Sequence, residues 1–270
     1  MNKSFTPNSN LDQHFLVDKE TISDLVKYSN IKKDDVILEI GPGFGELTKE
    51  LSKKAKKIIA VDIDERFKEY LINMPKNVEI HFGNALNYLK KEREEKSRVF
   101  NKIVSSPPYN LCEQILQYLA LAKHVEKTIL IVPTRFSKKV QENPFFNSFF
   151  NFRVLREVPK ESFDPIPRVN SAILEITNKE GYEKDKDISA FIKRKLYMHE
   201  KSKLKNALVG AIIDFGKVSK QKITKNKAKE IIDKSQIKKK TLGEQVKHIS
   251  KEVLKEIGKI IAEVILVSPF

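Results

Sequence analysis

The residues best suited to chemistry form the tetrapeptide Ser106-Pro107-Pro108-Tyr109, which follows the short apolar run 102–104. Two consecutive prolines fix φ twice and remove two backbone donors, so the turn is stiff and its carbonyl oxygens stay free. Oxygens at Ser106 and Pro107 can accept from an exocyclic NH₂ group while Tyr109 stacks on the ring that carries it. The tetrapeptide indicates a site for a planar amine, although Pro-Pro-Tyr is also compatible with a rigid loop or a proline-rich ligand.

A glycine-rich loop upstream favours the first interpretation. Residues 39–45 have the sequence Glu-Ile-Gly-Pro-Gly-Phe-Gly, between an expected strand and an expected helix. A dinucleotide fingerprint requires Gly-x-Gly-x-x-Gly, and Glu46 occupies its last glycine position. The spacing found here is that of loops that bind S-adenosylmethionine. Gly41 and Gly43 would let the backbone approach this cofactor, and Glu39 would organise its cationic amino-acid end.

Polar side chains also end the next two expected strands. Asp62 follows strand 57–61, where a carboxylate matches two adjacent ribose hydroxyls, with Asp64 as the weaker candidate. Asn84 follows strand 78–82, where its side-chain oxygen would accept from the cofactor's adenine amine. Each residue alone is also typical of an ordinary strand end, but the ordered set favours a cofactor site.

The tetrapeptide is expected beside that site, because ligands bind at the carboxyl ends of parallel strands. An aromatic amine is a poor nucleophile, since its lone pair is delocalised into the ring. Ser106 Oγ and the Pro107 carbonyl would accept both amine hydrogens and aim the lone pair at a methyl donor, while Tyr109 stacks on the base. A base inside a duplex cannot reach such a pocket, so the target must be unpaired or flipped.

The alternation of strand and helix patterns predicts a doubly wound parallel α/β sheet with helices on both faces. A closing antiparallel pair is expected at 154–158 and 172–177, and the phenylalanine-rich stretch 145–152 is expected to pack. The expected parallel strands are 36–40, 57–61, 78–82, 102–105 and 128–132, and the expected helices are 18–28, 46–54, 65–74 and 113–122.

A second domain is predicted after the charged linker 178–187, where the strand pattern stops. Residues 188–270 have helical periodicity only, with Leu204, Leu208 and Ile212 on one face. We therefore expect a methyltransferase domain over residues 1–180 and a small, basic, all-helical RNA-binding domain over residues 181–270.

Net charge and composition limit the classes of function that the protein can have. The 270 residues carry a net charge of +15, which favours a polyanionic partner such as nucleic acid, although solvated surface lysines would give the same sum. Residues 217–240 hold ten lysines against Glu230 and Asp233. No apolar run approaches the roughly 20 residues that span a bilayer, no secretory signal is evident, and Cys112 is the only cysteine. We expect a cytoplasmic monomer without a membrane anchor or a metal.

Together these motifs resemble the ribosomal RNA adenine N6-dimethylases, a family that includes small-subunit dimethyladenosine transferases and erythromycin-resistance methylases. The resemblance runs from about Leu11 to the C-terminus and implies a Rossmann-like class I methyltransferase fold, S-adenosylmethionine as cofactor and ribosomal RNA as substrate. It puts Gly41, Asp62 and Asn84 at cofactor positions. Residues 199–208 are similar to the basic helix that opens the C-terminal domain of the small-subunit enzymes. This implies immature small ribosomal subunits as the partner.

Two further segments carry the resemblance. Residues 13–16, Gln-His-Phe-Leu, are similar to a segment that closes over the cofactor, which implies His14 and Leu16 as contacts. Residues 163–171 are similar to the Phe-x-Pro-x-Pro-x-Val-x-Ser loop of the family. This implies that Phe163 flanks the target base, with a core-anchoring aromatic as the alternative.

The sequence departs from the family pattern at three places. Ser106 and Pro107 stand where Asn-Leu or Asn-Ile is usual, and Ser-Pro-Pro-Tyr also occurs among DNA amino-methyltransferases, cytosine N4 enzymes included. Asn84 replaces the usual acid. Leu11-Asp12 stands where a basic residue and a glycine are common.

The leading hypothesis is that the protein methylates N6 of adenosine in small-subunit ribosomal RNA during ribosome assembly. We expect two methyl groups to be added. A second hypothesis is a methylase for another base, such as cytosine N4 or DNA adenine. A third is a non-catalytic RNA-binding assembly factor, against which the ordered cofactor residues argue.

Overall fold

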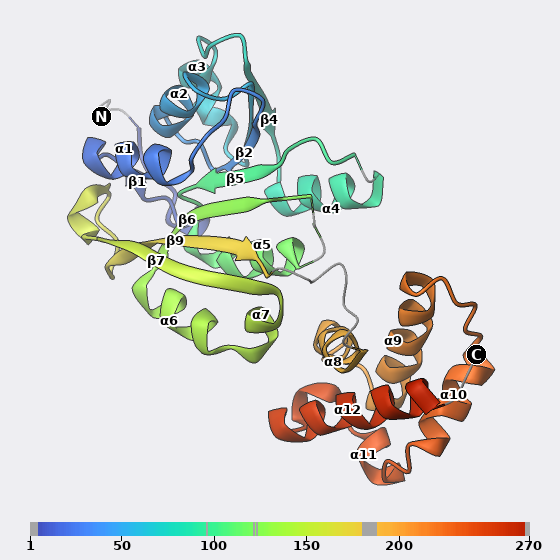
Figure 1. Cartoon of the computed structure of the whole chain (residues 1–270). Coiled ribbons are helices and arrows are strands. Elements are labelled where there is room, and N and C mark those ends of the chain that lie inside the picture. Colours follow the sequence, from blue (N-terminus) through green and yellow to red (C-terminus); the bar gives the residue numbers. More distant parts are fainter. Residues whose placement is uncertain (1–4, 96, 121, 123, 180–187, 268–270) are drawn as a thin grey trace. The chain divides into compact units, whose positions relative to one another are not determined.

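The computed structural model describes residues 5–95, 97–120, 122, 124–179 and 188–267. The chain divides into two compact units, residues 1–178 and 179–270 (Figure 1). Within the described residues, no helix is both long enough and apolar enough to cross a membrane.

The first unit is built on a seven-stranded sheet with the order β4-β3-β2-β5-β6-β9-β7. Strands β2 to β6 run parallel, and β9 lies antiparallel between β6 and β7. The strands are β2 (Val36–Ile40), β3 (Lys57–Asp62), β4 (Val78–Phe82), β5 (Lys102–Ser105), β6 (Lys127–Pro133), β7 (Phe150–Val158) and β9 (Ser171–Asn178). This order is that of a class I methyltransferase sheet, which confirms the predicted fold class and the closing antiparallel pair.

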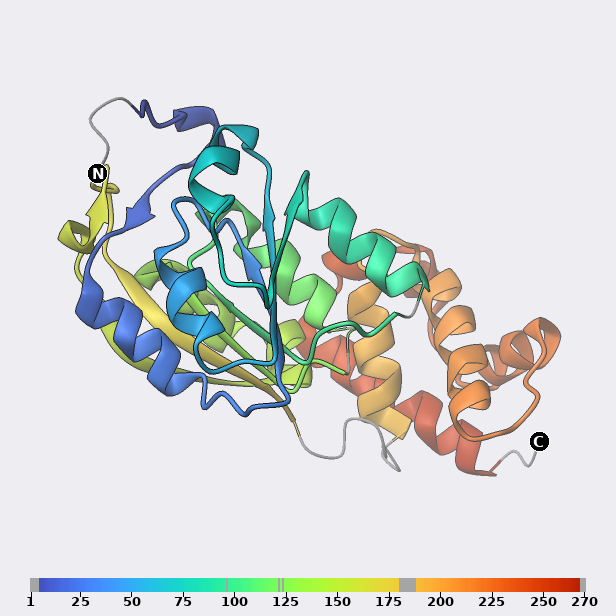
Figure 2. The ribbon, with the colours of Figure 1, turned by 90° about the horizontal axis from the view of Figure 1, so that it is seen from above.

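Helices cover both faces of this sheet (Figure 2). On one face, α1 and α2 bury apolar side chains such as Leu25 and Leu51 against Ile37 and Ile58 of the strands. On the other face, α4 packs beside α5, and α6 packs on β6 and β9. The helices are α1 (Lys19–Tyr28), α2 (Glu46–Ser52), α3 (Lys68–Leu71), α4 (Ala85–Glu95), α5 (Cys112–Leu119), α6 (Thr134–Glu142) and α7 (Pro144–Phe149).

The phenylalanine-rich stretch packs as expected. Phe146, Phe149 and Phe150 of α7 and β7 are buried, at 1–3% exposure, and the side chain of Phe145 lies outside the described part. The charge-dense end of α4 is solvated except for Glu92. That carboxyl is buried and accepts a hydrogen bond from the Tyr118 hydroxyl at 2.5 Å.

A second, two-stranded sheet pairs the N-terminal segment with the loop before β9. It consists of β1 (Phe15–Leu16) and β8 (Phe163–Asp164), which run antiparallel with Leu16 opposite Phe163. The sequence pattern did not predict this pair, because two residues are too few to show a strand period.

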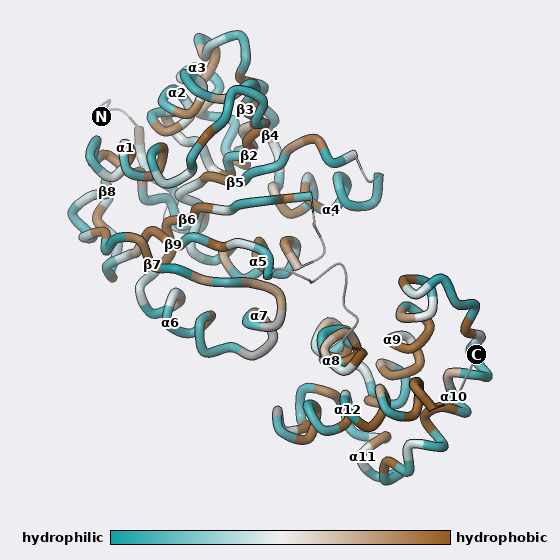
Figure 3. The backbone as a smooth tube through the Cα atoms, viewed as in Figure 1, coloured by the Kyte–Doolittle hydropathy of each residue, from teal (hydrophilic) through white to brown (hydrophobic). Residues whose placement is uncertain are grey.

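The second unit is helical. Leu204, Leu208 and Ile212 are fully buried in its core, so the predicted apolar face is confirmed. Figure 3 shows hydrophobic positions recurring along its helices, interleaved with hydrophilic ones. Its helices are α8 (Ile188–Met198), α9 (Leu204–Val218), α10 (Lys225–Lys234), α11 (Lys239–Gly243) and α12 (Lys251–Val267).

One short extended contact in this unit was not expected. Backbone hydrogen bonds join residues 200–204 to residues 244–247, with Lys203 opposite Gln245. The contact places the basic residues that open α9 beside Lys247. Lys201, Lys203 and Lys247 are all exposed.

Candidate active site

The glycine loop between β2 and α2 needs glycine at positions 41, 43 and 45, and the first two of these line the site. Gly41 has φ +71° and Gly43 has φ +53°, in the left-handed region that side chains disfavour. A Cβ on Gly41 would lie 3.3 Å from Cδ of Pro108, and one on Gly43 would lie 3.0 Å from the ring of Phe15. The loop therefore touches both the proline tetrapeptide and the N-terminal segment.

Asp62 ends β3 with its carboxylate held by two backbone donors. Its Oδ2 accepts from Gly43 N–H at 3.1 Å, and its Oδ1 accepts from Asp64 N–H at 2.9 Å. Burial raises the pKa of this carboxyl above its ordinary value. Each oxygen keeps a second lone pair for a ligand hydroxyl.

Glu39 lies inside β2, two residues before Gly41, and is 2% exposed. Burial raises the pKa of its carboxyl to about 8, and the neighbouring Asp62 charge adds to this rise. Within the described part of the chain, its Oε2 has no hydrogen-bond partner. A buried carboxyl oxygen without a partner is costly, so Glu39 is suited to receive a cationic group.

A serine hydroxyl joins the ends of the two central strands. The regular β2–β5 pairing ends at Leu38 and Ile103. Beyond it, Ser105 Oγ donates to the Ile40 carbonyl at 2.6 Å and accepts from Ile40 N–H at 3.3 Å. This contact sets the start of the tetrapeptide next to the start of the glycine loop.

Tyr109 is fixed at both its backbone and its side chain. The Tyr109 N–H donates to Asp12 Oδ2 at 2.9 Å, and its hydroxyl lies 2.6 Å from Ser171 Oγ at the start of β9. Burial raises the pKa of the phenol, so it is uncharged near neutral pH. The ring is thereby held as a fixed neutral surface.

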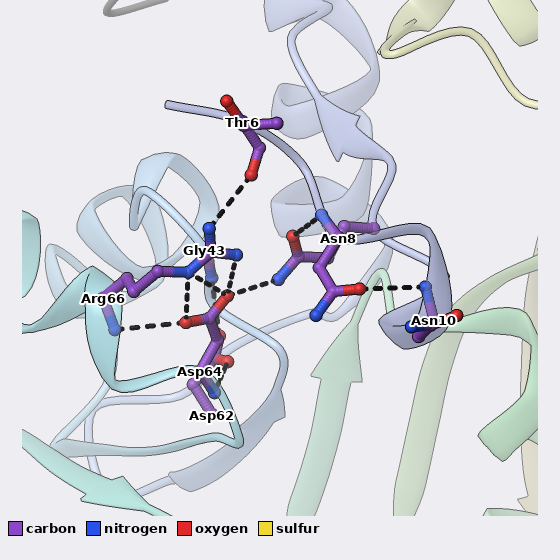
Figure 4. Close-up of polar contacts among 8 residues, drawn as sticks. Thr6, Asn8, Asn10, Gly43, Asp62, Asp64 and Arg66 are labelled. Carbon is purple, nitrogen blue, oxygen red and sulfur yellow. Dashed lines mark hydrogen bonds and ion pairs between the residues drawn. The ribbon is translucent and has the colours of Figure 1, made fainter. Parts of the chain in front are cut away.

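Residues 5–16, here called the N-terminal strap, are tied to the end of β3. Gln13 Nε2 donates to Asp64 Oδ2 at 2.7 Å, and Arg66 donates to both oxygens of Asp64 and to the Thr6 carbonyl (Figure 4). The hydrogen-bonded Arg66 guanidinium lowers the pKa of Asp64 to about 2. Asp64 thus anchors the strap as a permanent anion.

The strap also reaches the loop after β8. His14 Nδ1 lies 2.8 Å from the Pro165 carbonyl oxygen, to which it donates. Together with the β1–β8 pairing, this contact brings the strap, the glycine loop, Asp62 and the tetrapeptide around one cavity. The cavity is lined by Leu11, Asp12, Gln13, His14, Phe15, Gly41, Gly43, Asp62, Ile63, Phe67, Ser106, Pro107, Pro108 and Tyr109.

The cavity therefore gathers seven residues that the sequence singled out. They come from the strap, the glycine loop, the end of β3 and the tetrapeptide: His14, Gly41, Gly43, Asp62, Ser106, Pro107 and Tyr109. Four others, Leu16, Glu39, Asn84 and Phe163, do not line it.

Two of these four belong to the hydrophobic core. Phe163 is 2% exposed and packs among the strand and helix side chains, so it does not flank the cavity as expected. Leu16, its partner in the β1–β8 pair, packs against the same core instead of lining the cavity. The pairing turns both side chains inward, and the core-anchoring alternative for Phe163 is the one found.

Asn84 serves as a helix cap. Its Oδ1 accepts from the Leu86 N–H at 2.8 Å and the Asn87 N–H at 3.3 Å, at the start of α4. Both lone pairs of that oxygen are used, so it is not free to accept from an adenine amine as expected. The group left to face a ligand is the Nδ2 donor.

Sequence reasoning missed several cavity residues. In the sequence, Asp12 is distinguished only as a departure from a common glycine, and Ile63 and Phe67 carry no signal. Phe67 belongs to an aromatic cluster beneath the strap, where Phe5 stacks on it at 4.8 Å and Phe44 meets Phe15 edge-on at 4.9 Å. Within the described residues, no group of three or more His, Cys, Asp or Glu side chains is placed to hold a metal.

Comparison with known proteins shows the family to which the chain belongs. A model of ribosomal RNA adenine dimethylases matches residues 4–253. The chain belongs to the ribosomal RNA adenine dimethylase family. A relative from Pyrococcus furiosus, named "Probable ribosomal RNA small subunit methyltransferase A", is 34% identical over 218 residues, or 76% of each chain. A relative of the same name from Methanococcus aeolicus is 31% identical over 269 residues, 93% of this chain and 94% of the relative.

Solved structures show the same fold. A dimethyladenosine transferase from Plasmodium falciparum superposes with a TM-score of 0.57 and 20% identity, covering 92% of this chain and 98% of that one. The 23S rRNA methyltransferase ErmE gives a TM-score of 0.54 and 18% identity, covering 92% of this chain and 99% of that one. Each likeness extends over 92% of this chain and shows that the chain shares the fold of that structure.

The dimethylase family depends on S-adenosylmethionine, and the site's own chemistry fits this cofactor. The unpartnered buried oxygen of Glu39 matches a cationic ammonium group. Asp62 keeps lone pairs for two ribose hydroxyls. Gly41 and Gly43 present bare backbone at the cavity wall.

Proposed function

We propose that this protein is an S-adenosylmethionine-dependent methyltransferase that modifies N6 of adenosine, through to the dimethylated form, in small-subunit ribosomal RNA. One observation carries the proposal. The tetrapeptide that can hold an aromatic amine and the loop that fits the cofactor line the same cavity and touch at Gly41 and Pro108. The bound cofactor would supply an electrophilic methyl group.

Glu39 and Asp62 would hold the cofactor on either side of its sulfonium centre. Glu39 is buried behind the cavity wall, so its partnerless oxygen would receive the ammonium group through a water molecule. Asp62 would accept from the ribose hydroxyls while Gly43 and Asp64 keep its carboxylate fixed. Holding the amino-acid moiety and the ribose, which flank the sulfonium, fixes the position of the methyl group without any contact to that group.

Ser106 Oγ and the Pro107 carbonyl would accept the two amine hydrogens of the adenine. This withdraws the nitrogen lone pair from the ring and directs it across the cavity. Tyr109, held by Asp12 and Ser171, would stack on the base and fix its plane. The proton leaves after transfer, so no strong base is needed.

The second unit would hold the RNA. Of the ten lysines in residues 217–240, only Lys217, Lys227 and Lys234 pair with an acid of the described chain. The other seven are exposed, as are Lys201, Lys203 and Lys205 at the start of α9. Such a surface suits contacts with phosphates, which position RNA without reading its sequence.

We further propose immature small subunits as the form recognised, and a cytoplasmic monomer as the active species. Incubation with labelled cofactor and either immature or mature small subunits, followed by mass spectrometry of the nucleosides, tests both substrate and base. Dimethyladenosine from immature subunits supports the proposal. Methylcytosine would favour the alternative of a cytosine N4 methylase, with which Ser106 and Pro107 are compatible.

A further inference from the structure

Asp12 occupies a backbone conformation that usually calls for glycine. Its φ of +54° and ψ of +42° are left-handed, where aspartate is among the few tolerated side chains. Its N–H caps the short 3₁₀ turn Ser9–Leu11 by donating to the Ser9 carbonyl. The conformation therefore explains why glycine is common here, but not why this chain carries a carboxylate.

The carboxylate has a partner inside the site. Asp12 Oδ2 accepts the Tyr109 N–H at 2.9 Å, across 97 residues of sequence. A charged acceptor makes this bond stronger than one between neutral groups. Pro107 and Pro108 have no N–H, so the first backbone donor after Ser106 is that of Tyr109. A hydrogen bond from this donor can hold the end of the tetrapeptide in place.

The strap that carries Asp12 is seated by other contacts. Gln13 bonds Asp64, His14 bonds the Pro165 carbonyl, and Phe5 stacks on Phe67. None of these contacts involves the Asp12 side chain. Asp12 Oδ1 does lie 3.7 Å from His14 Nε2, but His14 bonds the Pro165 carbonyl through Nδ1. Loss of the carboxylate should therefore release Tyr109 while the strap keeps its place.

We infer that Asp12 is a positioning residue, which sets the Tyr109 backbone, and with it the base-stacking ring, when the N-terminal strap is seated over the cofactor cavity. The inference rests on the proposed function, since it concerns how that site is prepared for its base. It makes closure of the strap a condition for a correctly placed Tyr109. The strap covers the cofactor cavity. Cofactor binding that favours the closed strap would therefore also favour binding of the base.

Two substitutions at this position isolate the hydrogen bond. Asp12→Gly keeps access to the left-handed conformation and removes the acceptor, whereas Asp12→Asn keeps an acceptor oxygen and removes the charge. Asp34→Asn is the matched control, because Asp34 is exposed in the turn before β2 and loses the same charge.

Amide hydrogen exchange reports the bond directly, because Tyr109 holds the only backbone N–H within residues 107–109. With S-adenosylmethionine bound and no RNA present, Asp12→Gly should speed exchange at Tyr109 by about 10-fold or more. Asp12→Asn should stay nearer the wild type, and Asp34→Asn should match it. Unchanged exchange at Tyr109 in Asp12→Gly would overturn the inference.

Kinetics then separate positioning from cofactor binding. We expect Asp12→Gly to lower kcat on small subunits by about 10-fold, with the Kd for S-adenosylmethionine changed by less than about threefold and partial rescue in Asp12→Asn. A loss of cofactor affinity as large as the loss in kcat would make Asp12 a cofactor contact and contradict the inference. A wild-type protein inactive on subunits would overturn the proposed function, while exchange at Tyr109 would still decide whether Asp12 holds it.

Discussion

The phenol oxygen of Tyr109 lies 2.6 Å from Oγ of Ser171, which is fully buried at the start of β9. This contact joins the loop after the central strand β5 to the antiparallel strand β9, on the far side of β6. It fixes the tilt of the ring, while the backbone of the same residue is held by the strap. A ring set from both ends is suited to receive a planar base.

Substitutions at Tyr109 should separate the hydroxyl from the ring. We expect Tyr109→Phe to lower kcat about fivefold, since it removes one neutral hydrogen bond. Tyr109→Ala should lower it about 100-fold, since it removes the stacking surface as well. Steady-state kinetics on small subunits measures both. Equal losses in the two variants would argue against stacking.

Ser171→Ala should resemble Tyr109→Phe, because each removes one partner of the same hydrogen bond. The double variant should then lose little more than either single one. Additive losses in kcat would show that the two residues act separately.

Ser106 should matter for turnover and little for cofactor binding. Ser106→Ala removes an acceptor for the amine, so we expect kcat to fall about 10- to 100-fold, with the Kd for S-adenosylmethionine nearly unchanged. Ser105→Ala is the companion variant, because its hydroxyl bonds the Ile40 backbone instead. It should lower the free energy of unfolding by about 1 kcal/mol. Equal loss of turnover and cofactor affinity in Ser106→Ala would contradict its role.

Glu39 should make the stability of the cofactor-free protein pH-dependent. The pKa of its carboxyl is about 8 in the folded protein, against an ordinary value of 4.5. A raised pKa contributes stability that is complete below 4.5 and is lost as the pH rises through 8. We expect the wild-type Tm to fall more between about pH 5 and pH 8 than that of Glu39→Gln. Parallel Tm profiles would show that Glu39 titrates normally.

The same carboxyl should release a proton when the cofactor binds near pH 7, because a cation beside it favours the ionised form. Calorimetric titration with S-adenosylmethionine in buffers of different ionisation enthalpy measures this release. It should be absent in Glu39→Gln.

The basic start of α9 should govern the salt dependence of RNA binding. We expect the double variant Lys201→Glu/Lys205→Glu to weaken binding to small subunits and to lower the log–log salt slope by roughly one per lost phosphate contact. An acidic side chain at position 205, in the first turn of α9, is favourable for the helix, so a folding defect is not expected.

The matched control is Lys32→Glu/Lys33→Glu. Both lysines are exposed and precede β2, at the edge of the sheet opposite the glycine loop, and the charge change is the same. A salt slope lowered equally in both double variants would show a general effect of net charge.

The sequence was sufficient to predict the elements that are determined by a local pattern of residues. Buried strands such as β3 and β6 contain continuous apolar runs, and the spacing of Gly41 and Gly43 is a local backbone requirement. Asp62 and Ser106 follow from strand order, because the carboxyl ends of parallel strands meet at one edge.

Contacts between distant segments could not be predicted in this way. The orientation of Phe163 depends on a two-residue pairing with the strap, which has no period in the sequence. Asn84 was expected to face a ligand, but the free N–H groups of α4 use its oxygen. Asp12 was visible as an unusual residue, and only its contact with Tyr109 N–H gives it a role.

The most direct test of the central claim is the identity of the nucleoside that this protein modifies. Purified protein, labelled S-adenosylmethionine and immature small subunits should yield N6-dimethyladenosine in the subunit RNA by mass spectrometry, and Ser106→Ala should yield about 10- to 100-fold less per unit time. N4-methylcytosine, or cofactor binding without any transfer to RNA, would contradict the account.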